Sequence, residues 1–296
     1  MSIVLYGRLK PHANQIIGQY QCGFREGVST SDEIQTLRQI LEKTEYQIET
    51  HRLFIDFKTA YDKVNRKQLC KAVLEFGIPP KVVRLTQAMM DGTTARVKVQ
   101  NELSESFQIR NGLRQGDALA YILFNIALEK MIRDTNINQR GNIFYKSVQI
   151  LAYADDINII SRTPKSLQEA TIALDGAARR MGMEINQPKT KYMICGTKNK
   201  YVENVFKVKH MTEQVNSFVY LGTLITTHNN TSVEINNRIT LANRSYFGLV
   251  NILKAKNINR KYKVIIYRVT RKSLRDFRTR LRNNQGRHGR KEHINR

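Results

Sequence analysis

Two adjacent carboxylates stand at the centre of an apolar stretch of this sequence. Asp155 and Asp156 interrupt the run LAYADDINII at residues 151–160. Apolar residues on both sides predict a strand, a tight turn and a second strand, with the acids at the bend. Buried carboxylates are costly unless a cation or a hydrogen-bond donor faces them. The pair therefore indicates a cation site at the end of a sheet, although the tetrapeptide YADD alone often marks an ordinary hairpin turn.

A third carboxylate, Asp56, lies in the apolar segment 52–57 (RLFIDF), which predicts a buried strand. Taken alone, it is better explained as a strand-end aspartate that caps a turn. If the two strands are neighbours, however, Asp56 converges with Asp155 and Asp156. Magnesium often takes one or two carboxylates plus substrate phosphates, and two ions about 3.5–4 Å apart support in-line displacement at phosphorus. We therefore expect these acids to hold two Mg²⁺ ions, with Mn²⁺ as the alternative, for phosphoryl transfer.

A loop bracketed by Gly112 and Gly116 precedes a helix predicted at 117–134. Glycine lets a backbone approach a nucleotide closely, and a helix N-terminus offers amides to an anion. In isolation, an ordinary strand-to-helix loop is the simpler explanation of this segment.

The elements around these residues mix helices and strands without regular β-α-β alternation, which predicts an α+β fold with an antiparallel sheet. One helix follows a capping-box spacing of Thr30 and Glu33. Alternating residues from Ala95 to Ile109 predict an antiparallel hairpin. Further helices are predicted at 66–76, 80–91, around Leu167–Met181 and at 232–256, and further strands at 148–160, 190–195, 204–209 and 218–225.

Composition narrows the class of protein. The chain has 296 residues, is 41% hydrophobic and carries a net charge of +24, and so basic a balance usually means a polyanionic partner such as nucleic acid. No stretch approaches the roughly 20 apolar residues of a membrane helix, and the N-terminus is no secretory signal. The cysteines (Cys22, Cys70 and Cys195) form no zinc or disulfide spacing. We expect an intracellular protein of the nucleus or cytoplasm, with no membrane partner.

Together the motifs resemble the reverse transcriptases of non-long-terminal-repeat (LINE-like) retrotransposons. Six stretches match in order and spacing between about residues 5 and 267: QCGFREGVST, FIDFKTAYDKV, GLRQGDALAYILFN, LAYADDINII, INQPKTKYM and FVYLG. Six ordered motifs are much more specific than one. The resemblance implies an RNA-directed DNA polymerase with a right-hand fold: fingers and palm over 1–228, the start of a helical thumb over 229–267, and a basic, disordered tail over 268–296.

The resemblance also implies roles for single residues. Asp56, Asp155 and Asp156 match the metal-binding triad, and Lys189 matches a proton donor to the leaving pyrophosphate. Tyr61 matches the bulky residue that excludes a ribose 2′-hydroxyl. The main-chain carbonyl of Phe57 matches a further metal ligand. Four residues match positions that line the nucleotide and the template: Arg25, Gln115, Gly116 and Tyr153. Three more match the primer grip: Tyr220, Leu221 and Gly222. Outside this context, Tyr61 would be core packing, Arg25 and Lys189 solvated surface residues, and FVYLG an ordinary strand.

Two departures from the family pattern stand out. Ala120 and Tyr121 replace the usual Ser-Pro, from which we expect an altered nucleotide pocket rather than a lost one. Beyond Tyr267 the sequence no longer matches, and 14 Lys and Arg against two acids between residues 260 and 296 are typical of a frameshifted or truncated end. A basic nucleic-acid-binding arm is the alternative. The expected upstream endonuclease is also absent, which is consistent with a fragment of a decayed element.

The sequence leaves rival functions open. The expected activity joins deoxynucleoside triphosphates to a DNA primer on an RNA template. A catalytically inactive remnant that only binds nucleic acid is the alternative, since the C-terminal part is unusual. A maturase-like intron protein and an RNA-dependent RNA polymerase fit less well. Neither the oligomeric state nor the RNA that is copied can be predicted.

Overall fold

The computed structural model describes residues 1–45, 49–137, 148–196, 207–208, 210–211 and 213–268. The chain divides into two compact units, Met1–Asn216 and Ser217–Arg296, which we describe separately.

A mainly antiparallel sheet forms the centre of the first unit. In the described part of the chain it has five strands in the order β11-β8-β1-β7-β6. The outermost strand β11 runs parallel to β8, and the other neighbours are antiparallel. The predicted α+β fold with an antiparallel sheet is therefore confirmed. The strands are β1 (Thr50–Ile55), β6 (Gln149–Tyr153), β7 (Asp156–Ser161), β8 (Lys191–Cys195) and β11 (Glu213–Gln214).

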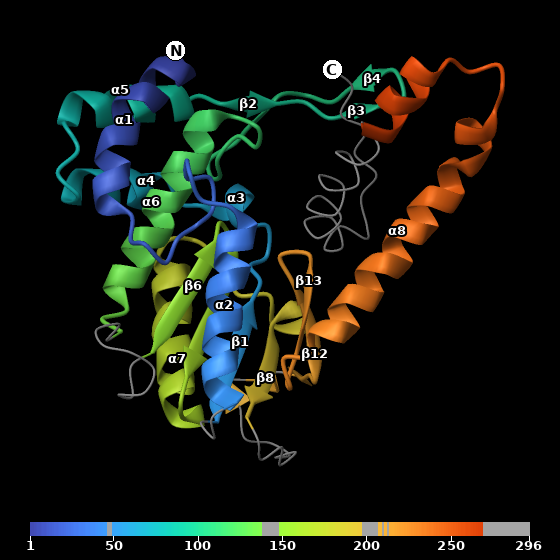
Figure 1. Cartoon of the computed structure of the whole chain (residues 1–296). Coiled ribbons are helices and arrows are strands. Elements are labelled where there is room, and N and C mark those ends of the chain that lie inside the picture. Colours follow the sequence, from blue (N-terminus) through green and yellow to red (C-terminus); the bar gives the residue numbers. More distant parts are fainter. Residues whose placement is uncertain (46–48, 138–147, 197–206, 209, 212, 269–296) are drawn as a thin grey trace. The chain divides into compact units, whose positions relative to one another are not determined.

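The two faces of this sheet are covered by different helices. Because side chains alternate along a strand, Leu53 and Ile55 of β1 share one face, where they join the large apolar core with α6 (Ala118–Asp134) and α7 (Pro164–Arg180). Arg52 and Phe54 share the other face. Helix α2 (Thr30–Glu45) contacts β6 and lies on the side of the sheet opposite α7 (Figure 1).

Further helices flank this core. Helix α1 (Ser2–Ile16) packs on α6 and buries Leu5, Leu9 and Ala13, a four-residue spacing that places them on one helical face. The sequence patterns did not predict α1. The helices predicted at 66–76 and 80–91 are α4 (Arg66–Glu75) and α5 (Pro80–Met90), and the short α3 (Ala60–Lys63) precedes them.

Helix α2 starts differently from its prediction. Thr30 already belongs to the helix, and the capping contacts come from Ser29, whose backbone N and Oγ donate to Asp32 Oδ2 at 2.6 and 2.7 Å. Glu33, the predicted partner of Thr30, is buried. The cap therefore lies one residue earlier than predicted. Ser29 and Asp32 have the same three-residue spacing as Thr30 and Glu33, so the spacing alone does not distinguish the two pairs.

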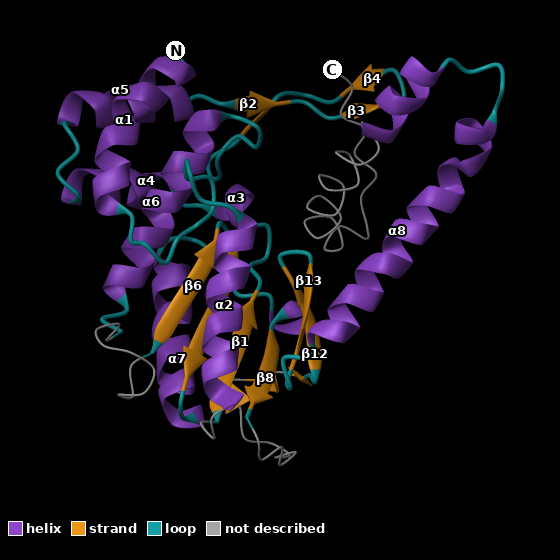
Figure 2. Cartoon of the chain, viewed as in Figure 1, coloured by secondary structure: helices purple, strands orange, loops and turns teal. Residues whose placement is uncertain are grey.

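The predicted hairpin between residues 95 and 109 is confirmed as a long two-stranded arm (Figure 2). Its strands are β2 (Thr94–Ala95), β3 (Lys98–Val99), β4 (Glu102–Leu103) and β5 (Phe107–Gln108). The strand predicted at 204–209 corresponds in part to β9 (Lys207–Val208), which pairs with β10 (His210–Met211), and residues 204–206 and 209 lie outside the described residues.

The second unit begins with a hairpin, β12 (Ser217–Tyr220) and β13 (Thr223–Thr226), followed by the long helix α8 (Thr231–Lys254). The buried Glu234 of α8 accepts a 2.7 Å hydrogen bond from Leu224 N and pairs with Arg238, so it fastens the helix to the hairpin. Across the described residues, no helix combines the length and apolar character needed to traverse a bilayer.

Arg52 is an unusual member of the sheet. It lies in the middle of β1 with none of its surface exposed, and Nε, Nη1 and Nη2 have no hydrogen-bond partner among the described residues. A buried charge without a partner is strongly unfavourable. If it has no partner, the guanidinium should lower the stability of the fold.

Replacing Arg52 by Met should consequently stabilise the protein. Removing the unpaired charge while keeping the side-chain length is expected to raise the free energy of unfolding by at least about 1 kcal/mol. Urea unfolding measures this change. The control Arg84→Met, on the exposed surface of α5, should change stability by less than about 0.5 kcal/mol. A less stable Arg52→Met variant would mean that the guanidinium has a partner.

Candidate active site

The sheet register brings the two predicted acidic segments together. Strand β1 pairs with β7 so that Ile55 lies opposite Ile157, and Asp56 follows directly after the end of β1. Asp156 opens β7 and pairs with Tyr153, which leaves Asp155 in the two-residue turn between β6 and β7. Continuing the antiparallel register places residue 56 across from residue 156. Acids from two distant stretches of sequence thus lie at one edge of the sheet.

The carboxylates of Asp56 and Asp155 interact electrostatically. Burial raises the pKa of Asp155 to about 6; a hydrogen bond from its own backbone opposes this shift, the negative charge of Asp56 adds to it, and Lys189 opposes it. Burial also raises the pKa of Asp56, against the influence of Lys189 and Asn186. Lys189 Nζ lies 4.0 Å from Asp56 Oδ2, and Asn186 Nδ2 donates to the same oxygen at 2.9 Å. Two partly buried, mutually repelling carboxylates are a setting that a cation stabilises.

The donor set suits a divalent cation. Within the described residues, no three His, Cys, Asp or Glu side chains gather closely enough to form a complete metal cage. Mg²⁺ seldom needs such a cage, because one or two carboxylates with water and substrate phosphates complete its octahedron. Asp56 and Asp155 supply hard oxygen donors of this kind. Asp156 adjoins them in the backbone, and its role as a third ligand stays a prediction.

Tyr61, the residue predicted to exclude a ribose 2′-hydroxyl, lies close to Asp155. It belongs to α3, and its ring stacks on Phe124 at a centroid distance of 4.2 Å and meets Tyr121 edge-on at 6.3 Å. Burial and the negative charge of Asp155 raise the pKa of its hydroxyl. The buried oxygen has no hydrogen-bond partner in the described part of the chain. The ring is therefore fixed by packing, next to an acid that the proposed chemistry requires.

The glycine-bracketed loop is attached to the Tyr61 segment. Gly112 has φ +85°, and a Cβ there would lie 2.6 Å from the carbonyl oxygen of Asp62, so only glycine fits. Leu113 N donates to Tyr61 O at 2.8 Å. Gln115 Nε2 is 3.3 Å from Asp62 Oδ1, whereas the position of Gly116 is open, with φ +92°. The roles of Gln115 and Gly116 toward nucleotide and template stay predictions.

Three other predicted residues make contacts within the described part of the chain. Arg25 Nη1 donates to the carbonyl oxygens of Gly18 and Gln21 at 2.9 and 3.2 Å, so the guanidinium holds a loop together. Phe57 is buried and bridges to Ile185. Tyr153 ends β6, with its ring 6.4 Å from that of Phe24. Contacts of these residues with nucleotide, template or metal stay predictions.

Sequence reasoning missed two residues of this site. Asn186 holds Asp56 through its side chain, and its backbone N donates to Asp56 O at 2.7 Å. It lies within the motif INQPKTKYM, directly before the 3₁₀ helix Gln187–Lys189 that carries Lys189. The second is Gln21 in QCGFREGVST, whose side chain contacts the turn. Because both residues lie within the recognised motifs, they could have been proposed as site residues. No local pattern, however, indicates which distant atoms they contact.

The predicted primer-grip residues belong to the second unit. Tyr220 ends β12, and Leu221 and Gly222 form the turn to β13 with φ of +45° and +85°. Two successive positive φ values are typical of the type I′ turns that join twisted strands. Their function stays a prediction.

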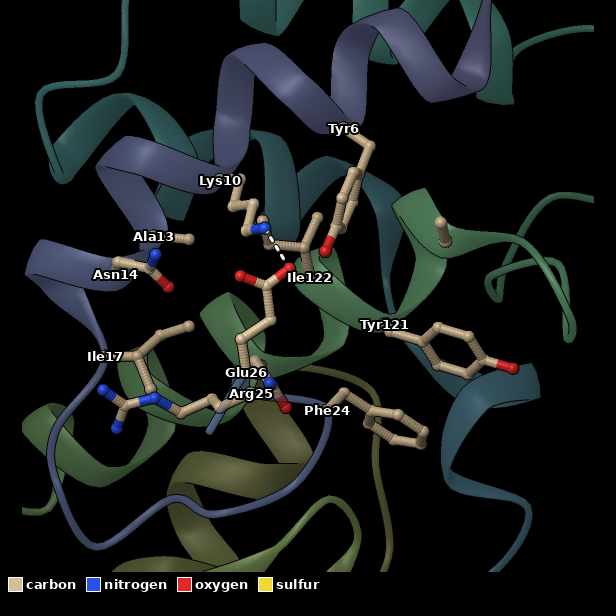
Figure 3. A pocket seen from close by; sticks show the side chains of 12 residues that line it. Tyr6, Lys10, Ala13, Asn14, Ile17, Phe24, Arg25, Glu26, Tyr121 and Ile122 are labelled. Carbon is tan, nitrogen blue, oxygen red and sulfur yellow. Dashed lines mark hydrogen bonds and ion pairs between the residues drawn. The ribbon is translucent and has the colours of Figure 1, made fainter. Parts of the chain in front are cut away.

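A pocket of about 190 Å³ lies between α1, the loop at residues 24–26 and the start of α6 (Figure 3). Lys10 and Glu26 form an ion pair within it. The rings of Phe24 and Tyr121 stack at its rim with a centroid distance of 4.1 Å. Tyr121 belongs to the Ala-Tyr pair that stands where the family usually has Ser-Pro. Because its ring also contacts that of Tyr61, it links the rim of the pocket to Tyr61.

Comparisons with known proteins agree with this geometry. Residues 1–225 match the model of the family described as reverse transcriptase (RNA-dependent DNA polymerase). A Pol polyprotein of the type-1 retrotransposable element R2 from Bradysia coprophila is 30% identical over 152 residues, 51% of this chain and 17% of that protein. Its counterpart from Popillia japonica is 26% identical over 145 residues, 48% of this chain and 24% of that protein. The chain thus spans a quarter or less of these relatives.

Among solved structures, an apo telomerase from Candida Tropicalis truncated from its C-terminal domain superposes with a TM-score of 0.58. It is 16% identical, and the match covers 76% of this chain and 44% of that one. At this identity the similarity shows the fold, and the predicted right-hand polymerase fold is confirmed. The predicted relationship to non-long-terminal-repeat retrotransposons is confirmed as well. The chain belongs to the reverse transcriptase (RNA-dependent DNA polymerase) family.

Proposed function

We propose that this chain contains the catalytic centre of an RNA-directed DNA polymerase, which extends a primer 3′-hydroxyl with deoxynucleoside triphosphates. The observation that carries the proposal is the sheet register, which brings Asp56 and Asp155 together where β1 ends and β7 begins. The family assignment supports it, since enzymes of this family generally use divalent metal ions.

The acids would hold the metal. Asp56 and Asp155 are the proposed ligands of two Mg²⁺ ions, Mn²⁺ being the alternative, with Asp156 and the carbonyl of Phe57 as further donors. When bound, such ions activate the attacking hydroxyl and stabilise the charge on the leaving pyrophosphate. The chain fixes these oxygens in place: Asn186 orients Asp56, and the two-residue turn orients Asp155. Lys189, 4.0 Å from Asp56 Oδ2, is the proposed proton donor to pyrophosphate.

The remaining residues would select and position the substrates. Tyr61 lies beside Asp155 and would exclude a ribose 2′-hydroxyl from the incoming nucleotide. Arg25, Gln115, Gly116 and Tyr153 are the proposed contacts to nucleotide and template, and Tyr220, Leu221 and Gly222 the proposed primer grip. The net charge of +24 favours binding of phosphate backbones. A related fold occurs in a telomerase from Candida Tropicalis described in complex with a fragment of telomeric RNA, which supports an RNA template.

Primer extension tests the proposal directly. The purified chain is incubated with an RNA template annealed to a DNA primer, the four deoxynucleoside triphosphates and Mg²⁺. We expect template-dependent extension by the wild type and none by Asp155→Asn. Equal extension by both proteins would exclude Asp155 from the catalytic centre and refute the proposal. Tight binding of the hybrid without any extension would instead support the inactive, nucleic-acid-binding remnant.

A further inference from the structure

The segment Gly18–Arg25, which we call the strap, runs along the edge strand β6 toward the turn that carries Asp155. Ala152 N donates to Tyr20 O and Cys22 N donates to Ala152 O, both at 2.8 Å. Gln21 and Ala152 form a parallel β-bridge. The strap therefore continues the sheet beyond β6 and ends beside the turn.

The side chain of Gln21 reaches the backbone of this turn. It is 1% exposed, and its Oε1 accepts hydrogen bonds from Gly23 N at 2.8 Å and Ala154 N at 3.1 Å. Its Nε2 lies 3.5 Å from Ala154 O. Ala154 has φ +56°, a left-handed conformation that is unfavourable for a residue with a Cβ. External contacts therefore have to hold Ala154, and Gln21 supplies them one residue before Asp155.

Gly23 brings the strap and the turn into backbone contact. A Cβ at this position would lie 2.2 Å from Ala154 N, which is closer than any side chain can approach. The absence of a side chain thus lets the strap pack directly on the turn, and it leaves room for the bonds of Gln21.

The strap is fixed from its other side by α6. Asn125 Nδ2 donates to Gly23 O at 2.8 Å, and Glu129 Oε2 accepts from Gly18 N at 2.9 Å and from the hydroxyl of Tyr20. Asn125 and Glu129 are buried. Because the glycine-bracketed loop leads into the same helix, the strap connects the turn of Asp155 to the segment proposed to line the nucleotide pocket.

We propose that Gln21 is a positioning residue that sets the place of the Asp155 carboxylate through the backbone of Ala154. The proposal rests on the polymerase function proposed above. Gln21 need not touch substrate or metal, since its hydrogen bonds end on the turn. A displacement of about 1 Å at a reacting group can lower a rate about 100-fold, so a loose turn would be costly for catalysis.

Two substitutions at this position separate the hydrogen bonds from the packing. Gln21→Leu keeps the volume and removes every bond, whereas Gln21→Glu keeps the two acceptor bonds from Gly23 N and Ala154 N. Gln87→Leu on the exposed surface of α5 is the matched control. We expect Gln21→Leu to lower kcat about 100-fold with KM for the nucleotide changed less than about threefold, and Gln21→Glu to recover part of the loss.

Binding of Mn²⁺ and hydrogen exchange provide readouts that do not need activity. Gln21→Leu should weaken Mn²⁺ binding, measured by titration calorimetry, and should speed exchange of the Ala154 amide at least about tenfold while amides of α7 keep their rates. Equal Mn²⁺ affinity and equal exchange in Gln21→Leu and wild type would overturn the proposal. So would an unprotected Ala154 amide in the wild type, which is decisive even if the variant does not fold. If the wild type extends no primer, the polymerase function is refuted. The role of Gln21 is still tested in that case, because Mn²⁺ binding and hydrogen exchange do not require activity.

Discussion

Asp56→Asn and Asp155→Asn should each reduce primer extension at least about 1000-fold, and the double variant should be no slower than either single one. Each substitution removes a negative charge from a pair whose members interact across one edge of the sheet. If the two acids hold the same cations, loss of either already disables the set. Independent roles would instead make the two losses multiply. Single-turnover incorporation of one deoxynucleotide on an RNA template measures all three variants.

The control for this experiment is Asp175→Asn on α7, which removes an acid whose ion pair with Arg179 is at the surface. It should retain the wild-type rate within about twofold, since surface ion pairs contribute little. Losses that multiply in the double variant would contradict the shared site. A wild-type rate in either single variant would exclude that residue from the machinery.

Tyr61→Val should admit ribonucleotides. The Tyr61 ring contacts Phe124 and Tyr121 beside Asp155, and we propose that the sugar of a bound nucleotide lies against it. Removing the ring opens space for a 2′-hydroxyl, so the preference for deoxynucleotides should fall by about 10- to 100-fold. The ratio of kcat/KM for a deoxynucleotide and its ribonucleotide counterpart measures this preference.

Tyr61→Phe is the matched control, because it keeps the ring and removes only the buried hydroxyl that lacks a partner among the described residues. We expect the wild-type preference and an equal or slightly higher stability, since no hydrogen bond is lost. A loss of preference in Tyr61→Phe as large as in Tyr61→Val would show that the ring does not exclude the 2′-hydroxyl. An unchanged preference in both variants would mean that a residue other than Tyr61 excludes the ribose 2′-hydroxyl.

The sequence predicted those parts of the fold that have a strong local pattern. The strands β1, β6 and β7 are short apolar runs, and α4, α5 and α7 have regular apolar spacing with clear ends. Helix α1 escaped prediction because its buried residues are few and Pro11 interrupts the pattern. The start of α2 was misplaced by one residue, since two polar pairs of equal spacing overlap there.

The candidate site was predictable only in part, for a similar reason. The acids stand out because a charge within an apolar strand is unfavourable without a purpose. Contacts such as Asn186 with Asp56 and Gln21 with Ala154 join residues more than a hundred positions apart, and no local preference encodes them. The burial of Arg52 in β1 was not predicted either, because the charged end of an arginine side chain is usually assumed to reach solvent.

We propose above that Asp56 and Asp155 together hold the divalent cations of a polymerase. Anomalous diffraction from crystals soaked in Mn²⁺ tests it most directly. We expect a peak with a carboxylate oxygen of each residue within about 2.3 Å, which disappears in Asp155→Asn. A fully occupied Mn²⁺ site elsewhere, with both carboxylates left unliganded at a Mn²⁺ concentration that supports activity, would exclude them as the metal ligands.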